Sequence, residues 1–292
     1  MIQDISPSKL DNHYDPSKNP TDGSIILVFS KEKNLLGNLN EDTKEISFPR
    51  YKDFSGLEKE KLTYLFTIDG EEFFLLLTDA EDKSLLSLNA SAVSSYEFNI
   101  FRTYRNSYFY PKTYVYAAFT AYQLAEWYMV TKFCGRCGAE NKHSTKERAM
   151  ICPKCGNIIY PRINPAVIIG VIDKEAGKLL LTKYKTGYGH NALVAGFTEI
   201  GETLEETVSR EVMEEVGLTV TNIRYYKSQP WGIASDILVG FFCDVTGKRE
   251  ITMDQGELRF ASWLSPEDVE LQPLEYSLTN EMMKMFKEGK II

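Results

Sequence analysis

Short apolar runs bounded by polar turns recur along the first third of this chain and predict β-strands. Ser24–Phe29 is one such run. Tyr64–Thr78 reads as two β-rich runs on either side of Asp69 and Gly70, a dipeptide that is typical of a hairpin turn. Leu85–Leu88 predicts a further short strand.

The periodicity then changes. Over Pro111–Phe133 apolar residues recur at steps of three and four, which predicts a helix. Together with the preceding strands, this helix predicts an N-terminal α+β domain over residues 1–130, and its first 20 residues are polar enough to form an irregular arm.

A second set of strands is predicted in residues 161–292, which we interpret as a separate domain. An amphipathic helix is expected over Glu275–Lys287 and a loop over Gly187–His190. The predicted strands are Ala166–Ile172, Lys178–Thr182, Val220–Lys227, Ile237–Cys243 and Leu258–Trp263.

One helix stands out between these strands, in the stretch Gly196–Leu218. Val208, Val212 and Val216 are four residues apart, so they share one face and are expected to point into a core. Gly217 stands where such a helix would end.

The same helix is crowded with carboxylates. Glu205 and Glu206 lie in the first turn, where the helix dipole favours negative charge. Glu211, Glu214 and Glu215 lie further along and need another explanation than the dipole. A solvated acidic face is one interpretation, and a Mg²⁺ or Mn²⁺ site that leaves room for substrate phosphates is the other.

This stretch resembles the Nudix box, G-x5-E-x7-R-E-U-x-E-E-x-G-U with U aliphatic, at every specified position. The matching residues are Gly196, Glu202, Arg210, Glu211, Val212, Glu214, Glu215, Gly217 and Leu218. The resemblance implies a metal-dependent hydrolase and, with the strand pattern, an α/β/α sandwich.

Composition and charge fit a soluble protein that is not a dedicated nucleic-acid binder. The chain has 292 residues, of which 43% are hydrophobic and 25% charged, and its net charge is −8. No apolar run is long enough for a membrane span, and the N-terminus does not read as a signal peptide. A cytoplasmic location and no membrane partner are therefore expected.

Four of the five cysteines form two C-x2-C pairs, Cys134 with Cys137 and Cys152 with Cys155, each followed by glycine. Four thiolates close a tetrahedral zinc site with no open position, so we predict a structural zinc ribbon over residues 131–160. Paired disulfides are the alternative, which a reducing compartment disfavours. Cys243 lies in an apolar run and is expected to be a buried thiol.

A four-Cys ribbon directly before a Nudix box resembles the NADH pyrophosphatases. Three further segments are similar to that family: Tyr160–Ile163 after the ribbon, Ser228–Trp231 after the box, and Ala261-x-Trp263 after Glu257 and Leu258. The resemblance covers about residues 100–292 and reaches the N-terminal domain only loosely.

The family resemblance implies roles for the carboxylates. Glu211, Glu215 and the backbone carbonyl of Ala195 would bind Mg²⁺ or Mn²⁺, with Glu257 as a further ligand and catalytic base. Glu214 would be a ligand or would position water, and Arg210 would orient the carboxylates while Glu202 braces the loop.

The resemblance also implies substrate contacts. Tyr160 and Phe197 would sandwich the base, although for these two alone a role as core aromatics is an equal alternative. The remaining candidates are Glu147 between the cysteine pairs, Gln229, Trp231 and Asp236 after the box, and Arg105, which would contact phosphate from the N-terminal side.

The chain departs from the family in one segment. The family continues S-Q-P-W-P-F-P-x-S, whereas here Ser228–Trp231 is followed by Gly232–Asp236, without the later prolines and with Asp236 where serine is expected. We expect a more flexible pocket wall, with substrate preference affected and the hydrolytic residues intact.

The sequence thus favours hydrolysis of NAD(H) to NMN(H) and AMP, with NAD-capped RNA 5′ ends as an extension that a basic cluster in the ribbon supports. A broader pyrophosphatase acting on ADP-ribose or dinucleoside polyphosphates is the nearest alternative. A non-catalytic nucleotide sensor is an alternative of another class. The resemblance also implies a homodimer. The basic cluster consists of Arg136, Lys142, Lys146 and Arg148.

Overall fold

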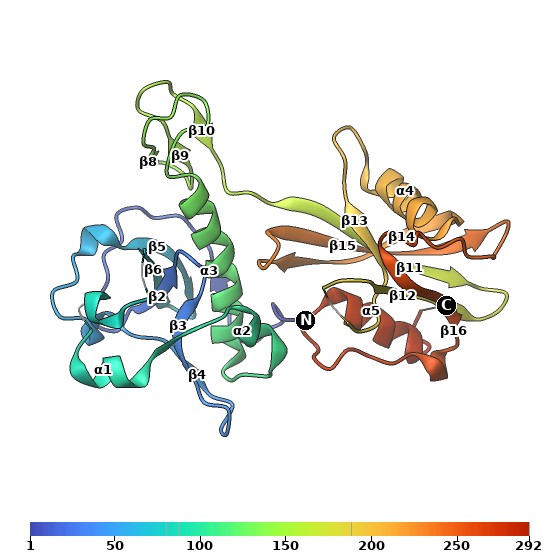
Figure 1. Cartoon of the computed structure of the whole chain (residues 1–292), viewed down its shortest axis with the longest axis horizontal. Coiled ribbons are helices and arrows are strands. Elements are labelled where there is room, and N and C mark those ends of the chain that lie inside the picture. Colours follow the sequence, from blue (N-terminus) through green and yellow to red (C-terminus); the bar gives the residue numbers. More distant parts are fainter. Residues whose placement is uncertain (80, 87, 188, 292) are drawn as a thin grey trace. The chain divides into compact units, whose positions relative to one another are not determined.

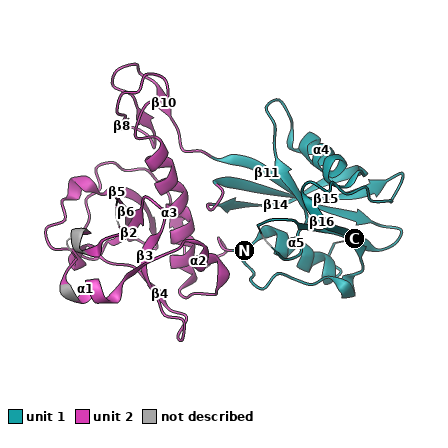
Figure 2. Ribbon diagram, in the orientation of Figure 1, with its two compact units in different colours: residues 1, 163–231, 235–292 teal, residues 2–162, 232–234 magenta. Residues whose placement is uncertain are grey.

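The computed structural model describes residues 1–292 apart from residues 80, 87, 188 and 292, and the chain divides into two compact units (Figures 1 and 2). One unit comprises residues 2–162 and 232–234 and is called the N-terminal unit here. The other comprises residue 1 together with 163–231 and 235–292 and is called the catalytic unit, because it holds the carboxylates that the sequence leads us to expect in catalysis.

The N-terminal unit is built on a mixed sheet in the order β1-β5-β6-β2-β3-β4, with β7 paired to β3. β2 runs parallel to β6, and the other neighbours are antiparallel. The strands are β1 (Leu10–Asp11), β2 (Ile25–Ser30), β3 (Leu35–Leu39), β4 (Ile46–Ser47), β5 (Thr63–Ile68), β6 (Glu71–Thr78) and β7 (Glu97–Asn99).

The predicted hairpin is confirmed, because β5 and β6 are joined by Asp69 and Gly70, both with positive φ as a two-residue turn requires. The predicted long helix is α3 (Lys112–Val130), which packs on β2, β5 and β6. Two short helices precede it, α1 (Ala90–Ser95) and α2 (Arg102–Asn106).

The strand predicted over Leu85–Leu88 is wrong in the described part of that range, and residue 87 lies outside the described residues. Lys83–Leu86 forms a 3₁₀ turn, and Leu88 makes an isolated bridge to Phe54. A short apolar run does not distinguish a strand from a helical turn, because both bury neighbouring apolar side chains. Two more 3₁₀ turns lie earlier in this unit, Tyr51–Asp53 and Lys59–Lys61.

The ribbon follows α3 within the same unit. Its small antiparallel sheet has the order β10-β9-β8, from β8 (Lys142–His143), β9 (Met150–Ile151) and β10 (Ile158–Ile159).

The catalytic unit contains a six-stranded mixed sheet in the order β14-β15-β11-β12-β16, with β13 paired to β11. β11 and β15 are parallel, and all strands predicted in this region are confirmed. They are β11 (Asn164–Asp173), β12 (Lys178–Tyr184), β13 (Val194–Phe197), β14 (Thr219–Trp231), β15 (Asp236–Thr246) and β16 (Leu258–Leu264).

Helices α4 (Leu204–Val216) and α5 (Leu278–Lys287) lie on opposite faces of this sheet (Figure 1). The alternation of β11 explains why, since Val167 and Ile169 belong to the core under α4, whereas Gly170 faces Met282 of α5. A 3₁₀ turn, Pro266–Asp268, lies between β16 and α5. None of the helices in the described part of the chain has both the length and the apolar character of a membrane span.

Candidate functional site

The catalytic helix α4 begins and ends on local signals. Thr203 caps the helix by accepting from the Glu206 N–H, and the Glu206 carboxylate accepts from the Thr203 N–H in return. Gly217 ends it in the left-handed conformation, with φ of 68°. Val208, Val212 and Val216 are fully buried in the core, as predicted, and this fixes the direction in which the carboxylates of the other faces point.

Arg210 is hydrogen-bonded to three glutamates, which together with Glu215 and Glu257 form the acidic cluster. Its guanidinium forms a two-point bond to Glu202, at 2.6 and 2.9 Å, and donates to Glu211 at 2.7 Å and to Glu214 at 3.0 Å. It also donates to the Phe197 carbonyl at 2.9 Å. This planar fork ties the loop before α4 to the helix, which is the geometry an orienting residue requires.

The contacts of Glu202 support the expectation that it braces the loop before α4. Besides Arg210, its carboxylate accepts from the Glu199 N–H at 3.1 Å and from the Thr207 hydroxyl at 3.1 Å. Arg210 and these donors hold the pKa of Glu202 at about 2. Glu202 is therefore ionised and fully occupied within the protein.

Glu215 differs from Glu202 in its burial and in the direction of its pKa shift. It is only 3% exposed, and burial raises its pKa to about 8, with the nearby carboxylates of Glu211 and Glu257 adding to the rise. Its Oε1 accepts from the Ala195 N–H at 3.5 Å and from the Tyr184 hydroxyl at 3.3 Å. Its Oε2 is buried and has no hydrogen-bond partner among the residues that the structure describes.

The residues present fit a hard divalent cation. An orphaned carboxylate oxygen is costly to bury without a ligand. Burial likewise raises the pKa of Glu211, whose carboxylate lies so close to Gly196 that a Cβ there would be 2.0 Å from its Oε1. Carboxylate oxygens are the ligands that Mg²⁺ and Mn²⁺ prefer, and the structure places Glu211, Glu215 and Glu257 near one another.

The loop that carries Glu257 is held by backbone bonds. The Lys185 N–H donates to the Glu257 carbonyl at 2.9 Å, and the Asp254 N–H donates to the Glu215 carbonyl at 2.8 Å. Glu214, by contrast, has a side chain that is 60% exposed and bonded to Arg210.

Sequence reasoning missed Tyr184. Its phenol reaches Glu215 from the end of β12, and burial together with the carboxylates of Glu215, Glu257 and Glu211 raises its pKa, so it remains a donor. A single tyrosine at the end of a predicted strand gives no signal of this contact.

The structure brings two of the predicted substrate residues together in the ribbon. The Tyr160 hydroxyl donates to the Glu147 carboxylate at 3.1 Å, and the Tyr160 ring is 55% exposed. Phe197, in the catalytic unit, is 54% exposed at the end of β13. Neither aromatic is a core residue, so both rings are free to stack on a ligand.

Gln229 is engaged inside the catalytic unit. It is fully buried, and its amide donates to the Tyr276 carbonyl at 2.7 Å and accepts from the Leu278 N–H at 2.6 Å. It therefore fixes the start of α5. Trp231 and Asp236, which face each other in the β14–β15 pair, are also largely buried, and burial raises the pKa of Asp236 to about 6.

The departure from the family motif has a steric reason. A Cβ at Gly232 would lie 2.1 Å from the Phe119 carbonyl, so proline cannot occupy this position in the present structure. Residues 232–234 belong to the compact N-terminal unit, drawn in magenta in Figure 2, and the expected loosening of this segment stays a prediction.

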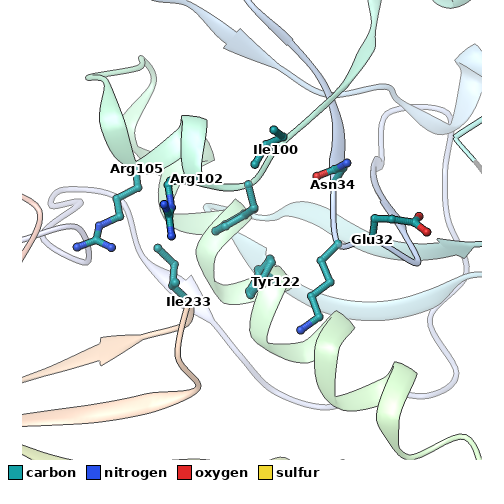
Figure 3. Close-up of a pocket in the computed structure, with 9 residues that line it drawn as sticks. Glu32, Asn34, Ile100, Arg102, Arg105, Tyr122 and Ile233 are labelled. Atoms are coloured by element: carbon teal, nitrogen blue, oxygen red, sulfur yellow. The ribbon is translucent and has the colours of Figure 1, made fainter. Parts of the chain in front are cut away.

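Arg105 lines a pocket of about 240 Å³ in the N-terminal unit, together with Ile233 of the altered segment. Figure 3 shows Arg102 and Arg105 on one side of α2, next to Ile233. The same pocket includes Lys33 and Tyr122, so cationic groups and an aromatic ring surround it. Two predicted contacts, Arg105 and the altered segment, are thus brought to one place.

The four predicted cysteines gather as expected. Their sulfur atoms all lie within 4.8 Å of one another, with Cys134 and Cys155 3.7 Å apart and Cys137 and Cys152 3.5 Å apart. These separations are too long for disulfides and match the S–S spacing of about 3.8 Å that follows from a Zn–S bond of about 2.3 Å. The site is a closed structural one.

Arg148 was predicted to belong to a basic cluster in the ribbon, but its side chain contacts the N-terminal sheet. Its guanidinium donates to the Leu65 carbonyl at 2.6 Å and lies 5.3 Å from the Tyr14 ring centre. The Tyr14 hydroxyl donates in turn to the Ser144 carbonyl. Arg148 therefore fastens the ribbon to the N-terminal sheet.

Two family models match the chain. Residues 162–286 match the NUDIX domain, and residues 131–160 match the NADH pyrophosphatase zinc ribbon domain.

Curated relatives agree with these matches. The chain is 42% identical over 151 residues to proteins named NAD-capped RNA hydrolase NudC from Klebsiella pneumoniae subsp. pneumoniae and from Salmonella typhi. The match covers 52% of this chain and 58% of each relative, so the chain spans little more than half the length of these proteins. Among solved structures, a NUDIX hydrolase from Nitrosomonas europaea aligns with a TM-score of 0.45 and 27% identity, over 54% of this chain and 91% of that one.

Proposed function

We propose that this chain, a Nudix hydrolase that carries the zinc ribbon of the NADH pyrophosphatases, splits the pyrophosphate bond of NAD(H) into NMN(H) and AMP. The observation that supports it most is the Oε2 of Glu215, which is buried beside the carboxylates of Glu211 and Glu257 and has no partner in the described part of the chain. Mg²⁺ or Mn²⁺ would be held there by these three side chains and by the Ala195 carbonyl. Such an ion neutralises phosphate charge and acidifies water.

The chain's own residues account for the rest of the reaction. In the proposed reaction, a water oxygen bonds to one phosphorus, the bridging P–O bond breaks, and the water's proton passes to a carboxylate and then to solvent. Glu215 and Glu257 are the proposed acceptors, and Glu214 would position the water. Arg210 holds Glu211 and Glu214 in place through its fork of hydrogen bonds.

Recognition of the dinucleotide is assigned to residues outside the carboxylate cluster. Each unit is assigned its own contacts. In the catalytic unit, Phe197 would stack on a base, and Trp231 and Asp236 would contact the dinucleotide. In the N-terminal unit, Tyr160, which is bound to Glu147, would stack on a base, and Arg105 would face phosphate in the pocket it shares with Ile233. Gln229, whose amide is engaged with α5, would act through the position of that helix.

NAD-capped RNA is the proposed second substrate, because the same bond would be cut and the curated relatives are named for that activity. We also propose a homodimer and a cytoplasmic location. A broader pyrophosphatase that prefers ADP-ribose or dinucleoside polyphosphates is the competing function that Gly232 and Asp236 favour, since they alter a family segment.

The test is a metal-dependent hydrolysis panel with NADH, NAD⁺, ADP-ribose and diadenosine polyphosphates, in Mg²⁺ and in Mn²⁺, with products identified by mass. The highest kcat/KM for NADH, with NMNH and AMP as products, supports the proposal. A higher kcat/KM for another compound would assign a different substrate to the same site. Nucleotide binding without turnover would favour the sensor.

A further inference from the structure

Tyr184 is placed beside the acidic cluster by an irregularity at the end of β12. Lys183 pairs with Phe260 and Tyr184 with Leu258, so Arg259 is passed over and the register shifts at this point. Such bulges turn a side chain away from its regular direction and are common beside active sites. Tyr184 contacts the core beneath α4 with its ring and Glu215 with its hydroxyl.

The two oxygens of Glu215 are in different situations because of this contact. Oε1 accepts from the Tyr184 hydroxyl at 3.3 Å and from the Ala195 N–H at 3.5 Å. Oε2 is buried and receives no hydrogen bond from residues 1–79, 81–86, 89–187 or 189–291, nor from Leu88. Both distances are longer than those of strong hydrogen bonds. Two donors on one oxygen fix the rotation of the carboxylate and leave the other oxygen for a cation.

The residue after β12, Lys185, contacts the loop that carries Glu257. The Lys185 N–H donates to the Glu257 carbonyl, and the Lys185 ammonium donates to the Gln255 carbonyl. Two consecutive residues thus contact two segments that carry carboxylates: Tyr184 contacts Glu215 at the end of α4, and Lys185 contacts the loop of Glu257. Groups that orient a metal ligand in this way commonly change metal affinity 10–100-fold when they are removed.

We propose that Tyr184 is a positioning residue that fixes the Glu215 carboxylate through Oε1, so that Oε2 is presented to the catalytic cation. The inference rests on the proposed function in that it requires the cation site. It adds that affinity for the cation, rather than affinity for the dinucleotide, depends on the phenol.

The test compares Tyr184→Phe with Tyr226→Phe. Tyr226 is a matched control because it lies in the same unit and its hydroxyl also donates to a glutamate, Glu281, at 2.9 Å. Mn²⁺ binding to the metal-free proteins is measured from the electron paramagnetic resonance signal of free Mn²⁺, with no substrate present. Unfolding temperatures without metal show whether both variants fold.

We expect Tyr184→Phe to weaken Mn²⁺ binding about 10–100-fold and Tyr226→Phe to leave it unchanged. In the NADH assay, Tyr184→Phe should need correspondingly more Mn²⁺, recover kcat at saturating Mn²⁺ and keep the KM for NADH. A merely structural role would lower stability without this metal dependence.

A Mn²⁺ affinity of Tyr184→Phe within twofold of the wild type overturns the inference and leaves the proposed function standing. Absence of Mn²⁺ binding by the wild-type protein removes the cation site itself, and with it both proposals. If Tyr184→Phe does not fold, Tyr184→Met, which keeps an apolar side chain without a donor, is measured in the same way and judged by the same limits.

Discussion

Gly196→Ala places a methyl group against the carboxylate of Glu211. The new Cβ would lie 2.0 Å from both Oε1 and Cδ of Glu211 and 2.4 Å from Oε2. Because non-bonded carbon contacts are optimal at about 3.5–4.0 Å, the carboxylate has to move by about 1 Å or more. This displacement disturbs its 2.7 Å bond to Arg210.

The size of the effect follows from that displacement. A shift of about 1 Å in a catalytic group costs about 100-fold in rate, equivalent to about 2.7 kcal/mol of transition-state stabilisation. The fold should survive, because Gly196 lies in β13 without positive φ and alanine is tolerated in such a backbone. We therefore expect about 100-fold lower kcat/KM, weaker Mn²⁺ binding and a near-native circular dichroism spectrum.

The assay is NADH hydrolysis at several Mn²⁺ concentrations, with isothermal titration of Mn²⁺ alongside. Gly189→Ala is the control, since a Cβ there would have only an Arg259 nitrogen within 4 Å, at 3.8 Å. Gly196→Ala with the kcat/KM and Mn²⁺ affinity of the control would refute the reasoning that Glu211 must occupy this position.

Two further predictions concern stability. Burial raises the pKa of Asp236 from 3.8 to about 6 in the folded chain. Ionising Asp236 therefore lowers the free energy of unfolding. This loss is absent below about pH 4 and complete above about pH 6. Asp236→Asn removes this loss, which is about 1 kcal/mol once solvent screening is taken into account. It should therefore raise Tm by about 2–4 °C at pH 8 and by less at pH 4. An equal Tm shift at both pH values would contradict this. Chelating zinc and restoring Mg²⁺ should lower Tm by several degrees, because Arg148 joins the ribbon to Leu65; an unchanged Tm would show that the ribbon does not support the fold.

Much of the catalytic helix could be predicted from the sequence because its signals are local. Three valines at four-residue steps identify the buried face, and Gly217 identifies the end. The cysteine pairs were equally predictable, since thiolates at that spacing have few other uses.

What the sequence did not reveal depends on contacts between distant residues. Tyr184 meets Glu215 across 31 positions, and Arg148 meets Leu65 across 83. Gly232 looked like a loosened loop, and only the nearby Phe119 carbonyl shows why a side chain is excluded there. Gln229 was predicted to contact substrate, and its buried amide is instead engaged by α5. A strand was predicted over Leu85–Leu88, although Lys83–Leu86 forms a 3₁₀ turn, because so short an apolar run does not distinguish a strand from a helical turn.

Glu215→Gln tests whether the carboxylates around Glu215 perform metal-dependent cleavage of NADH. The substitution keeps the shape of a side chain that is 3% exposed and removes its ability to ionise. Burial raises the pKa of Glu215 to about 8. In the absence of metal and above about pH 8, where the buried group would ionise, we therefore expect Glu215→Gln to melt at or above the wild-type temperature. The account also predicts that release of NMNH and AMP falls by orders of magnitude at every Mn²⁺ concentration. Turnover like that of the wild type would contradict the account.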